Sequence, residues 1–301
     1  MYYMDRHSID SLSPLLACPL CGTHFTRQRT TLVCTNSHAF DIAREGYVNL
    51  LRKKLPGDTK EMLLARRTFF DQGYYQPVSD TINALLAAYA PSVSLQNSEG
   101  PSHLCILDAG CGEGYYLDRL RTDLSARDQL PLCLGIDISK DGIRLAAKRY
   151  PESHFLVANL KERLVLQDAT IQVMLNIFSP RNAEEYARVL SPDALLLVVI
   201  PGPTHLHQLR STLQLLNIEE SKEQHVIEQF SPRFSLLTTQ TLSYTLRLQQ
   251  PEISWLVMMT PNYWHLSPES RSALEQLETI QATVEMTFLL FQRRNEPQSL
   301  L

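Results

Sequence analysis

The chain has 301 residues, of which 44% are hydrophobic and 20% charged, a composition typical of a folded globular protein that excludes a disordered or collagen-like chain. Its length suffices for about two domains. The longest uninterrupted apolar run, Ala194 to Ile200, is far shorter than the roughly 20 residues that span a bilayer, and the first thirty residues contain no signal-peptide pattern. We therefore expect a cytoplasmic protein with no membrane partner.

Three cysteines and a histidine near the N-terminus have the spacing of a metal site. Two residues separate Cys18 from Cys21, and three separate Cys34 from His38. Two thiolates on one tight turn, followed by a second ligand pair, suit a tetrahedral ion, and a Cys3His set favours zinc. Because four protein ligands leave no position for a reacting water, we expect the zinc to be structural. His24 follows Cys21 too closely to form a good ligand pair and is interpreted as a surface residue.

The net charge of −4 conceals a basic segment, Arg44 to Arg67, which carries a net charge of +4 and leaves −8 on the rest of the chain. Taken alone, such a segment is as well explained by a solvated helix face as by contact with a polyanion. The charge distribution therefore leaves a nucleic-acid partner open without predicting one.

From residue 103 onward, short apolar runs alternate with amphipathic stretches, which is typical of βαβ units on a mostly parallel sheet. The first expected strand, Leu104 to Ala109, leads into a glycine-rich turn, and a helix is expected from Tyr115. Three glycines in this turn allow close approach of a ligand: Gly110, Gly112 and Gly114. A second strand, Leu132 to Ile138, carries Asp137 near its end, where a carboxylate can accept hydrogen bonds from both ribose hydroxyls of a nucleotide cofactor.

Two acidic residues indicate which nucleotide suits the turn. Asp108 precedes the glycines and Glu113 lies among them. Their charge disfavours the pyrophosphate of NAD, which is the alternative that a glycine turn alone leaves open. S-adenosylmethionine (SAM) has no phosphate and carries a positive sulfonium and a positive amino group, so acidic residues favour it. We therefore predict a SAM site.

The rest of the pattern completes an α/β domain. Strands are expected at residues 154–158, 170–177 and 194–200, helices at 181–190 and 204–216, a closing antiparallel pair at 239–248 and 284–292, and a helix and loop at 256–264. The end of the third strand places Asn159 beside the expected adenine. The end of the fourth places Asn176 and Phe178 where substrate is met, although core packing explains Phe178 equally well.

The series of motifs resembles the bacterial 23S ribosomal RNA guanine-N1 methyltransferases, which are class I SAM-dependent methyltransferases. The resemblance covers nearly the full chain. Besides the metal ligands and the glycine turn, it is carried by Phe40 to Leu51, Pro56 to Asp58, Ala65 to Arg67, Gly73 to Pro77, Ala147 to Pro151, Pro201 to Leu206 and Met259 to Pro261. It implies an α/β, Rossmann-like fold with a seven-stranded sheet and a small N-terminal zinc-binding domain.

The family implies transfer of a methyl group from SAM to N1 of one guanine in a 23S rRNA stem-loop by a homodimer. By this resemblance, Tyr75, Gly112, Glu113 and His205 contact the cofactor. Together with the strand-end residues, the expected cofactor-binding set is Tyr75, Asp108, Gly110, Gly112, Glu113, Asp137, Asn159 and His205. The target guanine must leave its stack, and we expect Tyr75 or Phe178 to stack on it and Asn176 or His205 to orient it, although His205 is better explained by contact with the cofactor alone. No proton acceptor for guanine N1 is evident.

The resemblance divides the chain into a zinc-binding RNA-recognition module at residues 1–50, a basic helical linker at 51–100 and a methyltransferase domain at 101–301. Two alternatives stay open. A small-molecule SAM-dependent methyltransferase would share the core, but it gives no reason for a zinc module joined to a basic segment. A non-catalytic zinc-dependent RNA-binding protein would have no need of the intact Asp108, Gly110, Gly112 and Asp137.

Overall fold

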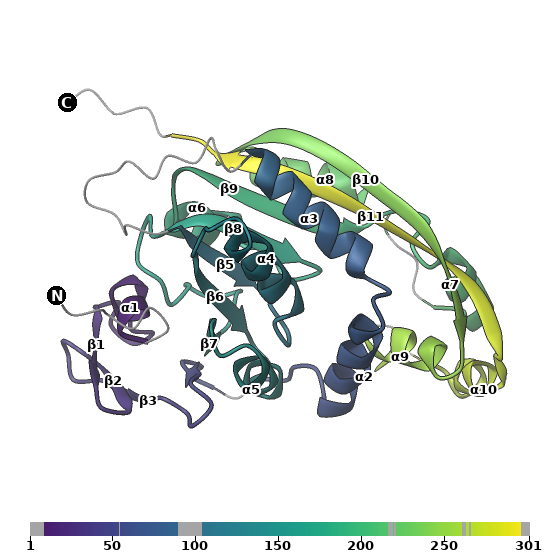
Figure 1. The fold of residues 1–301 in the computed structure, drawn as a ribbon, viewed down its shortest axis with the longest axis horizontal. Coiled ribbons are helices and arrows are strands. Elements are labelled where there is room, and N and C mark those ends of the chain that lie inside the picture. Colours follow the sequence, from purple (N-terminus) through teal and green to yellow (C-terminus); the bar gives the residue numbers. More distant parts are fainter. Residues whose placement is uncertain are drawn as a thin grey trace.

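The computed structural model describes residues 9–53, 55–89, 104–215, 219, 221–260, 263–264 and 266–295. An eight-stranded sheet forms the body of the molecule, and a three-stranded sheet lies at one end of it (Figure 1). This arrangement confirms the predicted α/β architecture with a small N-terminal module.

The N-terminal module begins with a short helix, α1 (Ile9–Leu12), and a 3-10 turn, η1 (Ser13–Leu15). Three antiparallel strands follow: β1 (Phe25–Gln28), β2 (Thr31–Cys34) and β3 (Ala39–Asp41). Strands this short bury few side chains by themselves. Phe25 and Leu32 instead pack in the same hydrophobic cluster as Leu107 and Leu156 of the main sheet. The module is therefore continuous with the core of the protein.

The main sheet has the strand order β10-β11-β9-β8-β5-β6-β7-β4. Five parallel strands form its centre: β5 (Cys105–Ala109), β6 (Leu132–Asp137), β7 (His154–Val157), β8 (Ile171–Ile177) and β9 (Leu190–Pro201). Two antiparallel strands, β10 (Phe234–Gln249) and β11 (Thr279–Arg293), close one edge. All seven predicted strands are present, and β9, β10 and β11 are longer than expected.

The eighth strand, β4 (Val48–Asn49), is not predicted by the sequence pattern because two residues show no periodicity. It pairs in parallel with β7, with Val48 opposite Leu156 and Asn49 opposite Val157. The segment that follows the small sheet thus extends the edge of the main sheet.

Helices cover both faces of the main sheet because successive residues of each buried strand point to opposite sides. Ile106 packs in one cluster with Leu117 and Ile143 of the helices on that side. Leu107 packs in the other cluster, which includes Phe230. The first face carries α2 (Lys60–Asp71), α3 (Gln76–Tyr89), α4 (Tyr115–Ser125), α5 (Lys140–Arg149), α7 (His207–Leu213), α9 (Glu252–Met258) and α10 (Pro268–Gln276), and the second carries α6 (Ala183–Val189) and α8 (Lys222–Phe230).

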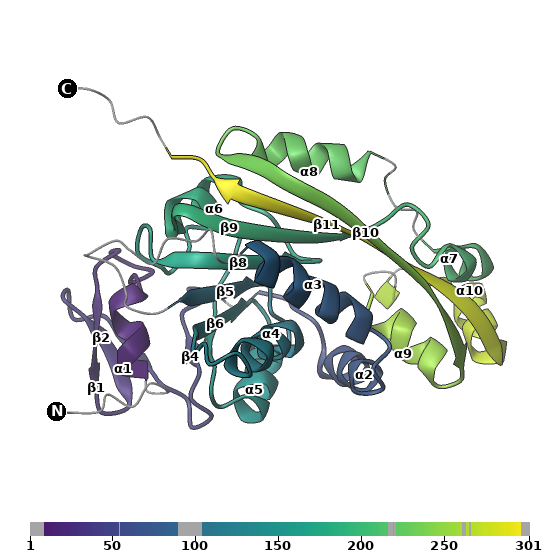
Figure 2. The same cartoon turned by 45° about the horizontal axis from the view of Figure 1, so that its top comes forward.

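Helix α4 begins at Tyr115 as predicted, whereas other helix boundaries differ. The helix expected at 181–190 ends at Val189 because Leu190 already belongs to β9, and the one expected at 204–216 spans only α7. Strands β10 and β11 form a long curved ribbon whose far end lies beside α7, α9 and α10 (Figure 2). Within the described residues, no helix combines the length and the apolar character needed to cross a membrane.

Candidate metal centre and cofactor site

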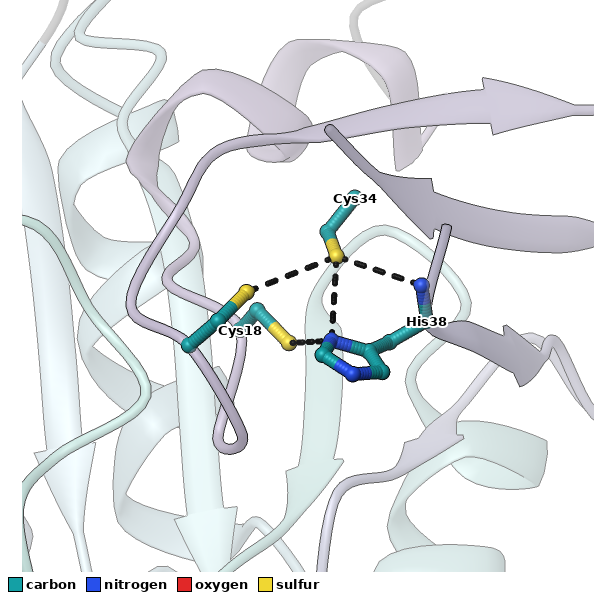
Figure 3. Close-up of side chains that lie close together, drawn as sticks. Cys18, Cys34 and His38 are labelled. Atoms are coloured by element: carbon teal, nitrogen blue, oxygen red, sulfur yellow. Dashed lines mark hydrogen bonds between the residues drawn. The ribbon is translucent and has the colours of Figure 1, made fainter. Parts of the chain in front are cut away.

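Two tight turns present the predicted metal ligands. In the first, Gly22 donates its N–H to the carbonyl of Cys18 at 2.8 Å and adopts a φ of +75°, which glycine tolerates. In the second, Cys34 donates its N–H to the carbonyl of His38 at 3.0 Å. The side chains of Cys18, Cys34 and His38 point toward one another from these turns (Figure 3).

The ligand atoms have the separations of a tetrahedral zinc site. The Nδ1 atom of His38 lies 3.6 Å from the sulfur of Cys18 and 3.4 Å from that of Cys34, and the sulfurs of Cys21 and Cys34 are 3.6 Å apart. All four ligand atoms lie within 4.8 Å of one another. Tetrahedral bonds of about 2.3 Å to sulfur and about 2.0 Å to nitrogen imply ligand separations of roughly 3.5 to 3.8 Å. The residues therefore fit zinc, whereas His24 is exposed and outside the group.

Thr23 lowers the pKa of one of these ligands, Cys21. Its hydroxyl lies 3.1 Å from the sulfur of Cys21, and this contact and the Thr23 N–H lower the pKa of Cys21 to about 6. A lowered thiol pKa favours the thiolate, which is the form that binds metal.

The glycine turn between β5 and α4 requires glycine for two separate reasons. Gly110, Gly112 and Gly114 all have positive φ, at +95°, +56° and +89°. A Cβ atom at position 110 would also lie 2.3 Å from the Cβ of Ser179, which follows β8. Because real Cβ atoms do not approach so closely, only glycine lets the two strand ends meet here.

Asp137 ties the glycine turn to the start of α5. One carboxylate oxygen accepts the N–H of Gly112 at 2.9 Å, and the other accepts the N–H of Ser139 at 2.8 Å. Burial raises the pKa of Asp137, and these two hydrogen bonds oppose that shift. Each oxygen keeps a second lone pair, so the carboxylate can still accept from the ribose hydroxyls of a nucleotide.

Two buried acids beside the turn fit a cationic ligand. Among the described residues, Oδ1 of Asp108 and Oε2 of Glu113 have no hydrogen-bond partner, although the two side chains are only 1% and 2% exposed. Burial and the nearby Asp137 carboxylate raise the pKa of Asp108 to about 8, and burial raises the pKa of Glu113 to about 7. Buried acids without partners are costly, and a positive amino or sulfonium group would offset that cost. The residues present therefore fit SAM.

The end of β8 presents Phe178 beside this turn. The residue is 46% exposed, and its backbone adopts a φ of +53°, which is unusual for an aromatic residue. The amide nitrogen of Asn176 lies 2.6 Å from the hydroxyl of Ser179, which donates to the carbonyl of Ala109. Buried Asn176 thus holds the turn that contains Phe178 against the end of β5.

Comparisons with known proteins match both parts of this site. A model of the RlmA N-terminal zinc ribbon matches residues 16–60, and a methyltransferase-domain model matches residues 107–198. The 23S rRNA (guanine(748)-N(1))-methyltransferase of Streptomyces fradiae is 35% identical over 281 residues, which are 91% of this chain and 95% of that protein. The chain belongs to the 23S rRNA (guanine-N1)-methyltransferase family.

Two further relatives, from Micromonospora griseorubida and Bacillus subtilis, are 36% and 31% identical to the chain. The alignments cover 91% and 92% of this chain and 97% and 96% of the relatives. The protein is a SAM-dependent methyltransferase of this family, and its cofactors are SAM and a structural zinc ion.

Three further residues are predicted to bind the cofactor, namely Tyr75, His205 and Asn159, and they differ in how deeply they are buried. Tyr75 is 2% exposed and packs against Phe69 and Phe70, with ring centroids 5.5 and 5.7 Å away. His205 follows β9; its Nδ1 accepts the N–H of Glu285 at 3.4 Å, and burial lowers its pKa to about 3, so the ring is neutral. Asn159 follows β7 and accepts the N–H of Lys161 through its side-chain oxygen. Their contacts with SAM stay predictions.

Arg66 is a residue of this site that the sequence analysis placed in the basic segment and in a family motif, but not in the cofactor-binding set. Its Nη2 atom lies 2.6 Å from a carboxylate oxygen of Asp58 and 3.3 Å from the carbonyl oxygen of Met259, and Nη1 lies 3.1 Å from where a Cβ on Gly112 would stand. Arg66 therefore joins α2 and α9 to the glycine turn. The Pro56 to Asp58 motif was the available signal, because a carboxylate so close in sequence is a natural partner for this arginine.

Proposed function

We propose that the protein transfers the methyl group of SAM to N1 of one guanine in a stem-loop of 23S rRNA. The observation that carries this proposal is the rigid attachment of the zinc ribbon to the methyltransferase sheet. Ala17 donates its N–H to the carbonyl of Val165 at 2.9 Å, Gln167 donates to the carbonyl of Leu15 at 2.8 Å, and β4 pairs with β7. A ribbon fixed in this way suits an extended substrate, whereas a small molecule gives it no role.

SAM would be held by the predicted set around the glycine turn, and when bound it supplies an electrophilic methyl group. Asp108 and Glu113 would face its positive groups, and Asp137 its ribose. These side chains are fixed by the fold before the ligand arrives, which limits the entropy lost when donor and acceptor are aligned.

The guanine would stack on Phe178. Base stacking on an aromatic ring needs an exposed face, and Phe178 offers one whereas Tyr75 is buried. Asn176 acts through Ser179 as a positioning residue for that ring. A guanine in a stem cannot reach a methyl donor, so the base must leave its stack before it meets Phe178.

The remaining expectations are part of the same proposal. A stem-loop would contact the basic segment through its phosphates, which gives orientation and salt dependence rather than base identity. A homodimer, a cytoplasmic location and the division at residues 50 and 100 stay predictions, and residues 90–100 of the linker lie outside the described residues.

The test is a methylation assay with the zinc-loaded full chain, labelled SAM and 23S rRNA that lacks the modification. We expect 1-methylguanine at one position of one loop, identified by nucleoside mass spectrometry and fragment mapping. Measurable SAM binding with no label in RNA would reject the proposal and favour a small-molecule substrate. RNA binding without SAM binding would favour a non-catalytic protein.

A further inference from the structure

A pocket of about 360 Å³ lies between the zinc ribbon and α5. Strand β3 and the turn between β3 and β4 form part of its wall. Strand β4 and Lys140, at the start of α5, form the rest. No predicted SAM-binding residue and no metal ligand lines it. It is therefore a candidate site that the two cofactors do not explain.

The lining offers an aromatic side chain together with hydrogen-bond donors and acceptors. Phe40 is half-buried and packs edge-to-face on Phe25, with centroids 5.6 Å apart, so its orientation is fixed. Asn49 accepts the N–H of Leu51 through its side-chain oxygen, which leaves the amide nitrogen as a donor at the exposed rim. Asp41 supplies an acceptor and Lys140 a positive charge. A ring to stack on, with donors and acceptors around it, is the chemistry that recognises an unpaired nucleobase.

A basic stripe leads away from this pocket along α5. Lys140, Arg144 and Lys148 are all exposed and are spaced four residues apart, so they lie on one face of the helix. Glu45 opposes the last two, at 3.8 and 3.9 Å, which are long distances for ion pairs in solvent. Asp41 lines the pocket and the exposed Asp141 neighbours Lys140, so phosphates along the stripe would compete with three carboxylates for these three cations.

We propose that this pocket binds one unpaired nucleotide of the RNA substrate, distinct from the methylated guanine, with its base on Phe40 and the adjoining phosphates along the α5 stripe. The proposal rests on the proposed function and specifies how the RNA is anchored. Lys140 directly follows Ser139, whose N–H binds the Asp137 carboxylate. A nucleotide held here would therefore fix the RNA next to the SAM site and between the zinc ribbon and the methyltransferase sheet.

The experiment measures the affinity of the zinc-loaded full chain for unmodified 23S rRNA as a function of salt. Phe40→Leu keeps an apolar contact with Phe25 but removes the stacking ring, and we expect it to weaken RNA binding about tenfold with an unchanged salt slope. Lys140→Gln should lower the slope of log K against log salt by about one. Arg294→Gln, which removes an exposed charge after β11, is the matched control and should bind as the wild type does.

The readouts separate the possible failures. Zinc content and SAM affinity should be unchanged in both pocket variants; a loss of SAM affinity would assign the pocket to the cofactor site and overturn the proposal. A change in oligomeric state with unaltered RNA affinity would make the pocket a contact between copies and overturn it equally. Wild-type methylation of rRNA with wild-type affinity in Phe40→Leu and Lys140→Gln would reject this inference alone. Absence of RNA binding by the wild type would reject the proposed function with it.

Discussion

Phe178 combines a partly exposed aromatic side chain with a left-handed backbone, and the backbone conformation is costly in a residue without a function. The positive φ costs on the order of 1 kcal/mol or more, and it persists because Asn176 and Ser179 fix the surrounding turn. The side chain lies partly exposed at the end of β8. A surface loop under no such demand would carry glycine or asparagine at this position.

We predict that Phe178→Gly separates stability from activity. Phe178 is 46% exposed, so its loss removes about half a side chain of burial, but glycine tolerates a φ of +53° and this relief offsets part of the cost; the free energy of unfolding should fall by no more than about 2 kcal/mol. Loss of the stacking face should raise the KM for RNA about tenfold or more while SAM affinity is retained. Urea unfolding, calorimetry with SAM and steady-state methylation give the three values. Unchanged RNA kinetics would remove Phe178 from the substrate site.

The acids beside the glycine turn predict a proton release on SAM binding. The pKa of Asp108 is about 8 and that of Glu113 about 7, both above their ordinary values of 3.8 and 4.5, so the free chain holds protons there near pH 7. Because the folded-state pKa values are raised, these groups stabilise the free fold below about pH 4, and that contribution is lost as the pH rises to about 8. A cationic ligand favours the ionised carboxylates over the protonated acids. SAM affinity should therefore rise between about pH 6 and pH 8, as these acids lose their protons.

Calorimetry at pH 7 in two buffers of different ionisation enthalpy measures this release, and we expect up to about one proton per SAM. Asp108→Asn should reduce it. Asp128→Asn is the matched control, since Asp128 is an exposed acid in the loop before β6 with a φ of +59° that asparagine tolerates. Equal release from all three proteins would show that Asp108 is not a group that SAM deprotonates.

At the scale of elements, the contact between the glycine turn and the end of β8 determines the shape of the cofactor site. We predict that Gly110→Ala destabilises the protein by roughly 2 kcal/mol or more and abolishes SAM binding, because its Cβ would meet Ser179 at 2.3 Å. Gly46→Ala is the control for backbone strain alone, since its φ is +93° and nothing lies within 4 Å of the added Cβ. Chemical denaturation of both variants tests the difference. Similar losses in the two would mean that strain, not the contact with Ser179, dominates.

The elements that carry the site were largely predictable from the sequence because local signals encode them. Apolar runs give β5, β6 and β8, the glycines give the turn, and the cysteine spacing gives the metal ligands. β4 was not predictable, because it depends on β7, which is distant in the chain. The ion pair of Arg66 with Asp58 has a local signal, but its hydrogen bond to Met259 was not predictable, because Met259 is also distant. The same holds for the pocket beside α5, whose walls come from segments separated by about ninety residues.

At the scale of the whole molecule, the zinc ribbon and the main sheet share one hydrophobic cluster. Leu16, Phe25 and Leu32 pack with Leu134 and other strand residues, and Leu16 also forms a bridge with Leu166. The ribbon that holds the zinc ligands therefore packs into the core of the main sheet and is not a separately packed module. Loss of zinc should therefore lower the stability of the main sheet as well as that of the ribbon.

We predict that removing zinc with a chelator, or by Cys34→Ser, lowers the Tm of the entire chain by at least about 5 °C in a single transition. The reason is that unfolding the two ligand turns frees Phe25 and Leu32 from the shared cluster, and the lost burial weakens the sheet to which it belongs. Scanning calorimetry with zinc analysis measures both quantities. Cys133→Ser, a buried cysteine outside the ligand set, should keep one zinc per chain and respond to the chelator as the wild type does. A separate early transition, with the main transition unmoved, would mean that the ribbon folds independently and that its contacts add nothing to the stability of the methyltransferase sheet.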